Sequence, residues 1–170
     1  MNSLETHPVP ADVDPDSWQL RIFGAVNTPM SIDRDELRSF PMQSYTDVFE
    51  CIEGWETDPL AWQGIRVETL LERSNPHPDA AYALVHGMDG EYACAFDLEV
   101  LGNAVLAVDL DGRPVPIEHG GPARLVPTDD DSVCWQQVKW VAGIEVTTTA
   151  SIDRDTAKEI ALGRIDVAEE

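Results

Sequence analysis

The chain has 170 residues, 43% of them hydrophobic, which is enough for one ordinary domain with a hydrophobic core and excludes a largely disordered body. Its 32 acidic and 11 basic residues give a formal net charge of −21, and the lack of a basic stripe disfavours nucleic-acid binding. Acids spread over every segment repel one another unless salt screens them, so we expect a protein of an extreme halophile with a very salty cytoplasm. The alternative is an ordinary acidic protein with a basic partner.

The chain begins with a polar, proline-containing stretch, residues 1–16, which predicts a flexible N-terminal arm. The stretch has neither the basic region nor the apolar run of a signal peptide. No segment approaches the roughly 20 apolar residues that cross a membrane. We therefore expect a cytoplasmic protein with no membrane span.

Residues 17–150 are expected to form the main domain, followed by an acidic helical tail over 151–170. Alternation of apolar and polar residues predicts a strand at 18–23, and short strand-like or apolar stretches predict further strands at 30–32, 43–50, 80–86, 92–96, 104–109, 124–126 and 140–146. Helix signals occur at 33–37, 67–73, 97–101 and 153–162, and residues 62–67 are predicted as a short connection. Many short strands with a few short helices, and no regular strand–helix alternation, predict an α+β fold with mixed β-sheets.

One of the three cysteines, Cys51, ends the predicted strand 43–50 in the sequence FECIEGW. A thiolate suits transition metals, and Gly54 lets the backbone turn so that a ligand can approach the sulfur. The alternative is a buried structural cysteine, which most free cysteines are. Cys94, between alanines in a predicted strand, is expected in the core, and Cys134 is left open. The odd number and the absence of CxxC argue against a disulfide framework.

A second motif, HGGPARLVP, contains His119 and Arg124. The glycines predict a tight loop whose N–H groups can bind an anion, and arginine offers a fork for phosphate. Lys139 is one of only two lysines in the chain, and we expect it to hold a phosphate rather than to be a stray surface residue. The alternative is that His119 is a turn histidine and Arg124 a surface arginine, without a binding role. A zinc set of Cys51, His86 and His119 is disfavoured because it lacks a fourth ligand.

The motifs FECIEGW, WQGI, DGEY, HGGPARLVP and VKWV, in this order between residues 18 and 146, resemble the molybdopterin-binding oxidoreductase domain, the catalytic domain of the sulfite oxidase superfamily. The resemblance implies a molybdenum–molybdopterin cofactor whose metal is bound by Cys51, the catalytic residue. It implies that His119 and Arg124 contact the pterin, and that Lys139 binds its phosphate. It further places Gln137, Val138 and Gly87 beside the cofactor.

The resemblance implies an oxidoreductase that transfers oxygen atoms or electrons to or from a small-molecule substrate. No CxxCH haem motif occurs, so an electron-transfer partner would be a separate protein. The chain departs from the family pattern, since no Arg-Asn-His block precedes the first strand. Glu50, Glu53 and Glu56 surround Cys51 in place of arginines, and the segment 127–137 is long and acidic, which makes sulfite a poor substrate because like charges repel. The alternative is a cofactor-free, non-catalytic binding or subunit module of the same fold.

Overall fold

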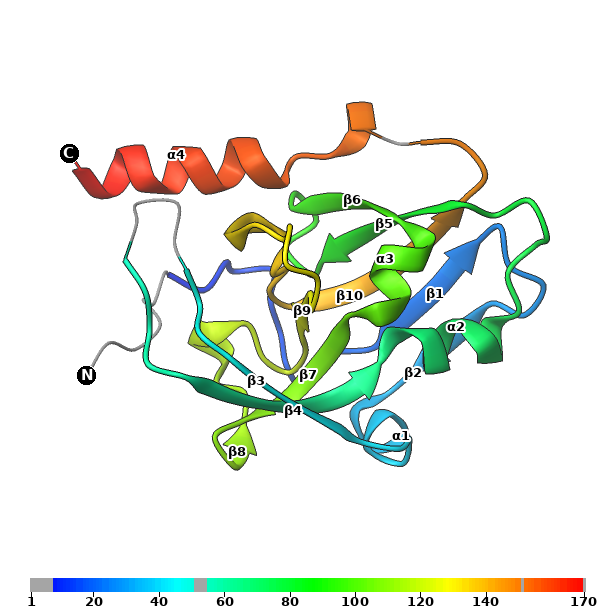
Figure 1. Cartoon of the computed structure of the whole chain (residues 1–170), viewed down its shortest axis with the longest axis horizontal. Helices are drawn as coiled ribbons and strands as arrows, with labels where there is room; N and C mark the ends of the chain where they lie inside the picture. Colours follow the sequence, from blue (N-terminus) through cyan, green and yellow to red (C-terminus); the bar gives the residue numbers. More distant parts are fainter. Residues whose placement is uncertain (1–7, 51–54, 151, 170) are drawn as a thin grey trace.

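The computed structural model describes residues 8–50, 55–150 and 152–169, with side chains described as far as 163. Within these residues the chain forms two five-stranded β-sheets with short helices (Figure 1), which confirms the predicted α+β class. The strands are β1 (Leu20–Gly24), β2 (Met30–Ile32), β3 (Gln43–Asp47), β4 (Leu60–Arg66), β5 (Tyr82–Gly87), β6 (Ala93–Asp97), β7 (Val105–Leu110), β8 (Arg113–Pro114), β9 (Arg124–Val126) and β10 (Val141–Thr147). The helices are α1 (Arg34–Arg38), α2 (Val67–Ser74), α3 (Leu98–Asn103), α4 (Ala157–Glu169) and the 3₁₀ turns η1 (Ile117–His119), η2 (Cys134–Gln136) and η3 (Ile152–Arg154).

The first sheet has the order β2-β1-β10-β5-β6. The last strand in the chain, β10, lies in the middle and pairs in parallel with β1 and antiparallel with β5. Ile144 is therefore opposite Ile22 on one side and Val85 on the other. All three side chains are fully buried, so the register is set by one continuous apolar row.

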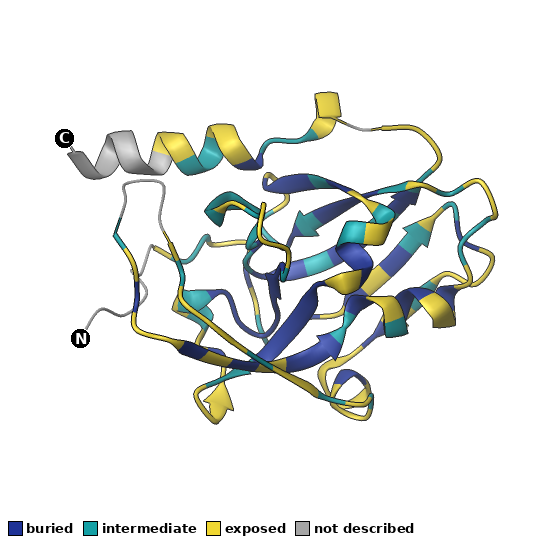
Figure 2. Cartoon of the chain, in the orientation of Figure 1, coloured by how far each residue is buried: buried dark blue, intermediate teal, exposed yellow. Residues whose placement is uncertain are grey.

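The second sheet has the order β3-β4-β7-β8, with β9 also pairing β7. The prediction of a short connection at 62–67 is wrong, because the seven residues of β4 start at Leu60 and carry the chain through this region. Trp62 is buried while its neighbours Ala61 and Gln63 are exposed, as expected for a strand with one face in the core. The strand β7 is mostly buried, whereas β3 at the sheet edge is mostly exposed (Figure 2).

The short helices begin and end where local chemistry requires it. The Asp33 carboxylate accepts a hydrogen bond from the Glu36 amide (2.8 Å) and caps α1, as predicted. The end of α2 is set by Asn75, which adopts a left-handed conformation and donates its N–H to the Leu71 carbonyl.

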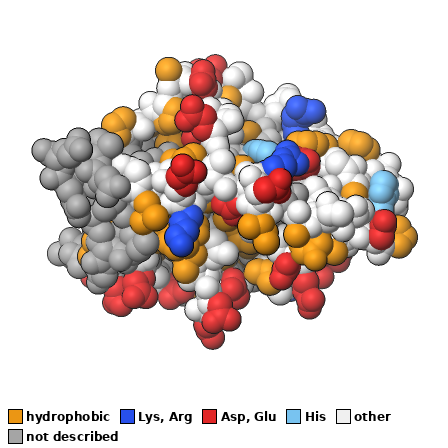
Figure 3. Space-filling model, turned by 90° about the horizontal axis from the view of Figure 1, so that it is seen from above, with side chains coloured by type: hydrophobic (Ala, Val, Ile, Leu, Met, Phe, Trp, Pro, Cys, Tyr) orange, Lys and Arg blue, Asp and Glu red, His pale blue; other side chains and the backbone are white. Residues whose placement is uncertain are grey.

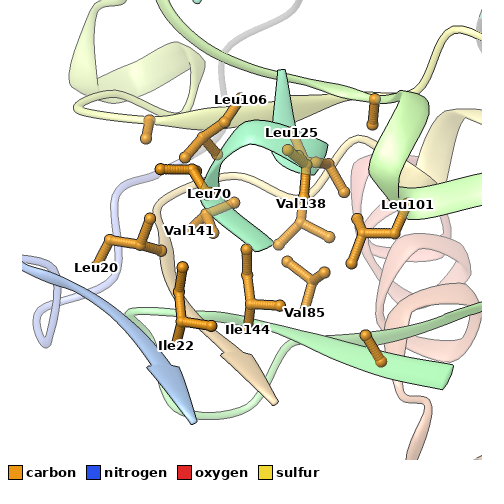
Figure 4. Close-up of a cluster of buried hydrophobic side chains, with 14 of the residues drawn as sticks. Leu20, Ile22, Leu70, Val85, Leu101, Leu106, Leu125, Val138, Val141 and Ile144 are labelled. Atoms are coloured by element: carbon orange, nitrogen blue, oxygen red, sulfur yellow. The ribbon is translucent and has the colours of Figure 1, made fainter. Parts of the chain in front are cut away.

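The main core lies between the two sheets and draws on nearly every element (Figure 4). Residues labelled there come from β1, α2, β5, α3, β7, β9 and β10, together with Val138, and all point into one apolar cluster. Cys94 is buried in this core as predicted, and burial raises the pKa of its thiol, with the nearby Asp155 charge adding to the effect. No helix among the described residues is both long and apolar enough to cross a membrane.

The C-terminal segment is fastened to the first sheet before α4 begins. Arg154 donates to both oxygens of the Glu145 carboxylate at 2.9 and 2.8 Å, and Asp155 accepts from the Ala95 amide at 2.8 Å. The helix itself starts at Ala157, later than the predicted start at Asp153. In Figure 1 it runs along the top of the molecule, away from the end of β6, and it contacts η2.

Candidate functional site

The HGGP sequence forms a loop that only glycine can make. Gly120, directly after η1, has a φ of +103°, which L side chains rarely adopt. At Gly121 an added Cβ would lie 1.9 Å from the Val115 carbonyl oxygen. The loop therefore turns tightly against the preceding chain and starts β9 at Arg124.

Arg124 is the centre of the site. Its side chain is buried, with 2% of the residue exposed. Nε and Nη2 donate to Gln137 Oε1 at 3.1 and 2.7 Å, and Nη1 donates to the His119 carbonyl oxygen at 2.9 Å. The guanidinium also lies 5.5 Å from the ring centroid of Phe49 and 5.4 Å from that of Trp62, within cation–π range.

The Arg124 charge has no acidic partner in the described part of the chain. The ion pairs formed there involve other residues, and the oxygens that bind Arg124 are neutral. Burial lowers the pKa of Arg124 to about 10, while nearby Tyr92 and Cys134 act in the opposite direction. A buried cation without a counter-charge is costly, and the arrangement suits an anion supplied from outside the chain.

His119 brings a second group to the same loop. Its Nδ1 is buried and has no hydrogen-bond partner among the described residues. Burial lowers the pKa of the imidazole, and the charges of Arg124 and Lys139 lower it further, against a smaller effect of Glu118. The ring is therefore neutral at neutral pH, and its free nitrogen is available to a bound group.

Lys139 is packed between two glycines. An added Cβ at Gly120 would lie 2.9 Å from Lys139 Cγ, and one at Gly87 would lie 3.2 Å from the Lys139 carbonyl oxygen. The Lys139 ammonium lies 5.7 Å from the ring centroid of Trp140, and the Trp140 amide donates to the Gly120 carbonyl at 2.9 Å. These contacts bring Gly87, the HGGP loop and Lys139 together in the fold.

The other two predicted residues support this arrangement in different ways. Gln137 binds Arg124 directly. Val138 is fully buried, its amide donates to Gln136 at 3.0 Å, and its carbonyl accepts from Leu125 at 2.9 Å. Val138 therefore anchors the segment in the core, and a direct role in cofactor binding stays a prediction.

Cys51 lies outside the described residues, but both flanks of its segment are placed. The Phe49 amide donates to the Thr57 hydroxyl oxygen and the Phe49 carbonyl accepts from the Thr57 amide, both at 2.9 Å. The Phe49 and Trp55 rings lie 5.6 Å apart. Phe49, two residues before Cys51 in the chain, also lies against the buried guanidinium of Arg124.

Sequence reasoning missed the aromatic surroundings of Arg124. Phe49 lies two residues after the end of β3, and Trp62 lies in β4, where the sequence predicted a connection. Tyr92 was also missed, although its hydroxyl donates to the Trp135 carbonyl and holds η2 in place just before Gln137. The alternation around Trp62 was the one signal that could have revealed the strand.

No zinc set is formed by the described residues, which leave out Cys51. His86, one of the candidate ligands, lies 3.1 Å from a Glu145 carboxylate oxygen instead. The chemistry that the site offers is anion binding by an arginine, a lysine and a neutral histidine.

A cavity of about 180 Å³ adjoins the site between the end of β3, strand β4 and the segment 126–137. Phe49, Trp62 and Gln137 line it and also contact Arg124. Cys134 lines it as well. Acidic side chains are spread over the surface of the molecule, as the face in Figure 3 shows.

Comparison with protein families identifies one that covers most of the chain. The family described as the oxidoreductase molybdopterin binding domain matches residues 6–154. The uncharacterized oxidoreductase YuiH of Bacillus subtilis (strain 168) is 29% identical over 145 residues, which cover 85% of this chain and 72% of that protein. The mitochondrial sulfite oxidase of Rattus norvegicus is 25% identical over 174 residues, covering 85% of this chain but only 31% of its own length.

Among solved structures, the sulfane dehydrogenase SoxCD from Paracoccus pantotrophus has a similar fold, with a TM-score of 0.75 and 23% identity. The match covers 82% of this chain and 40% of that chain. The chain thus has the fold of one part of these larger proteins.

Proposed function

The chain belongs to the oxidoreductase molybdopterin binding domain family, within the sulfite oxidase group, and we propose that it is an enzyme that holds a molybdenum cofactor through the Cys51 thiolate. The observation that carries this proposal is the buried guanidinium of Arg124, which has no acidic partner among the described residues. A chain with 32 acids could readily have supplied one. The missing charge fits an anionic group of a bound cofactor.

The residues present fit such a group in three respects. Arg124 supplies a rigid, buried cation, His119 has an unpartnered buried nitrogen, and Lys139 adds a second cation beside the glycine loop. We assign the pterin and its phosphate to these three side chains. Gln137 and Val138 orient them, and the small Gly87 keeps the space beside Lys139 free.

When bound, the cofactor supplies a redox-active metal for oxygen-atom or electron transfer. The protein's own contribution is to bind and orient. Arg124 holds negative charge in a site from which water is excluded, where charge-assisted hydrogen bonds are strongest. His119, neutral at neutral pH, offers a ring nitrogen that accepts or donates a hydrogen bond without adding charge.

The wider setting is also proposed. We infer a small-molecule substrate and a separate electron-transfer protein. We further propose a salt-rich cytoplasm as its compartment, and the division into an arm (1–16), the cofactor-binding domain (17–150) and an acidic helical tail (151–170).

The test is metal and pterin analysis of the protein purified in high salt from its own host. We expect close to one molybdenum per chain, and pterin fluorescence after oxidation. Cys51→Ser should lose the molybdenum, whereas Cys134→Ser, a matched thiol substitution, should keep it. Absence of both metal and pterin from the native protein would instead support a cofactor-free binding or subunit module.

A further inference from the structure

The cavity beside Arg124 has a strongly one-sided charge. Asp47 and Glu50 line it from the end of β3, and Asp129 and Asp130 line it from the loop after β9. Among the described residues that line it, none is a lysine, an arginine or a histidine. None of the four carboxylates takes part in the ion pairs formed by the described residues.

Three of the four carboxylates, those of Asp47, Asp129 and Asp130, act on the interior of the cavity and not only on its rim. The Tyr45 hydroxyl, which also lines the cavity, donates to Asp47 Oδ2 at 3.0 Å. The pKa of Tyr45 is raised to about 12, first by burial and then by the hydrogen bond and charge of Asp47, with Asp130 and Asp129 contributing from the opposite wall. Both walls therefore add negative potential at one point inside.

Arg124 does not neutralise this surface. Its guanidinium lies against the rings of Phe49 and Trp62 and donates to Gln137 and His119, and the residue is not part of the lining. The site thus has two zones, a buried cation on one side of the two aromatic rings and a group of carboxylates around the open cavity.

We propose that this cavity favours a small organic cation over an oxyanion, so that Asp47, Glu50, Asp129 and Asp130 determine the substrate class. The inference rests on the proposed function, because Glu50 directly precedes the proposed metal ligand Cys51 in the chain. A cavity lined by charge of one sign raises the local concentration of ions of the opposite sign and lowers that of like ions. Sulfite would meet four like charges, and no cation, in the part of the lining that the structure describes.

The cavity carries its own reporter, the thiol of Cys134. In a Cys51→Ser background, the other thiol, Cys94, is 1% exposed, so Cys134 is the group open to reagents. We would measure its modification rates with two thiosulfonates of similar size, one with a trimethylammonium and one with a sulfonate group. Dividing their rate ratio by that for free cysteine removes the reagents' intrinsic reactivity and any effect of the thiol's own ionisation.

We expect the cationic reagent to be favoured by about tenfold or more. Replacing the cavity acids together (Asp47→Asn, Glu50→Gln, Asp129→Asn, Asp130→Asn) should bring the ratio to within about twofold of free cysteine. The matched control removes four exposed acids from elsewhere (Asp35→Asn, Glu72→Gln, Asp79→Asn, Glu99→Gln) and should leave the ratio unchanged. The loop pair Asp129→Asn and Asp130→Asn, which leaves β3 intact, should give an intermediate ratio.

Two results would overturn the proposal. The first is that the Cys51→Ser protein shows no preference between the two reagents. The second is that the four cavity substitutions and the four control substitutions lower the rate ratio equally, which would assign the preference to overall net charge. The measurement needs no metal or pterin, so its failure is distinct from a failure of the proposed cofactor binding.

Discussion

Arg154 is about half exposed and donates to both oxygens of the Glu145 carboxylate, whereas Arg124 is buried and donates only to the neutral oxygens of Gln137 and His119. The hydrogen bond and charge of Glu145 raise the pKa of Arg154, while burial lowers that of Arg124 to about 10. The exposed Arg154 thus has an acidic partner within the fold, whereas the buried Arg124 has none among the described residues. The contrast indicates that the two charges serve different purposes, one to fasten the chain and one to receive an anion.

The largest effect is expected for Arg124→Met. We expect pterin content to fall by about tenfold or more, because charge-assisted hydrogen bonds contribute roughly 1.5–3 kcal/mol each. The unfolding free energy of the cofactor-free protein should change by no more than about 1 kcal/mol, since the cost of burying the charge disappears together with its hydrogen bonds. Pterin assay and urea denaturation measure the two quantities.

The paired control is Arg154→Met. It should cost less than about 1 kcal/mol of stability, as exposed ion pairs do, and leave the pterin content unchanged. If Arg124→Met kept its pterin but lost about 3 kcal/mol of stability or more, Arg124 would be a structural residue and the contrast would fail.

Gln137→Glu would make Arg124 resemble Arg154. The new carboxylate replaces the amide that accepts from Nε and Nη2, so the buried cation gains an internal partner. We expect the cofactor-free protein to gain about 1–3 kcal/mol in unfolding free energy and to bind less pterin. Gln136→Glu is the control, because its side chain accepts from the Val133 amide and not from Arg124. Equal stabilisation by both substitutions would contradict the account.

Raising KCl from about 0.2 M to about 2 M should affect exposed and buried charges differently. The repulsion among 32 acids would be screened, as would the exposed Arg154–Glu145 pair, while Arg124 would be little affected. We expect a net gain of about 1–2 kcal/mol, or roughly 3–8 °C in melting temperature for a chain of this size. Calorimetry would reveal it, and a fall in melting temperature would remove the halophile proposal.

Glu145→Gln tests the fastening role through pH. Hydrogen bonding to Arg154 holds the pKa of Glu145 below its ordinary value of 4.5, with His86 contributing and burial acting against it. The stabilisation is therefore present above the ordinary pKa and is lost as the pH falls through the lowered one. The variant should be about 1 kcal/mol less stable at neutral pH and should match the wild type in acid. A difference that persists at the lowest pH would assign the loss to packing.

The smallest effect is expected for His119→Gln. Because the pKa of His119 is lowered by burial and by Arg124 and Lys139, the unfolded chain takes up a proton before the folded one. The wild type should therefore lose stability as the pH falls below the ordinary value of 6.5, by less than about 1 kcal/mol since the ring is half-buried. Urea denaturation between neutral and mildly acidic pH should show a shallower slope for the variant. Identical slopes would mean that the imidazole is not perturbed.

Much of this architecture follows from local sequence signals. The strand at 124–126 and the helix predicted at 33–37 each depend on a few adjacent residues, so the sequence alone was sufficient to predict them. The tight turn of the HGGP loop was predicted in the same way, from its glycines, whereas its role as an anion site stays a prediction.

The features that the sequence did not predict depend on contacts between residues far apart in the chain. Gly64 lies in the predicted connection 62–67 but is part of β4, and an added Cβ there would lie 2.0 Å from the Leu106 carbonyl oxygen. The glycine therefore marks where β4 and β7 approach closely. Likewise, the contacts of Arg124 with Phe49 and Trp62 become visible only when three strands are assembled.

The central position of β10 has a consequence for synthesis of the protein on the ribosome. Until Val141–Thr147 has emerged, the first sheet consists of two separate hairpins, β1–β2 and β5–β6, with no strand to join them. Contacts between distant parts of a chain slow folding. The two hairpins therefore cannot join into one sheet before β10 is available. The sheet that completes the core, and with it the setting of the candidate site, can form only after nearly the whole domain has been translated, so cofactor loading is expected to follow translation rather than accompany it.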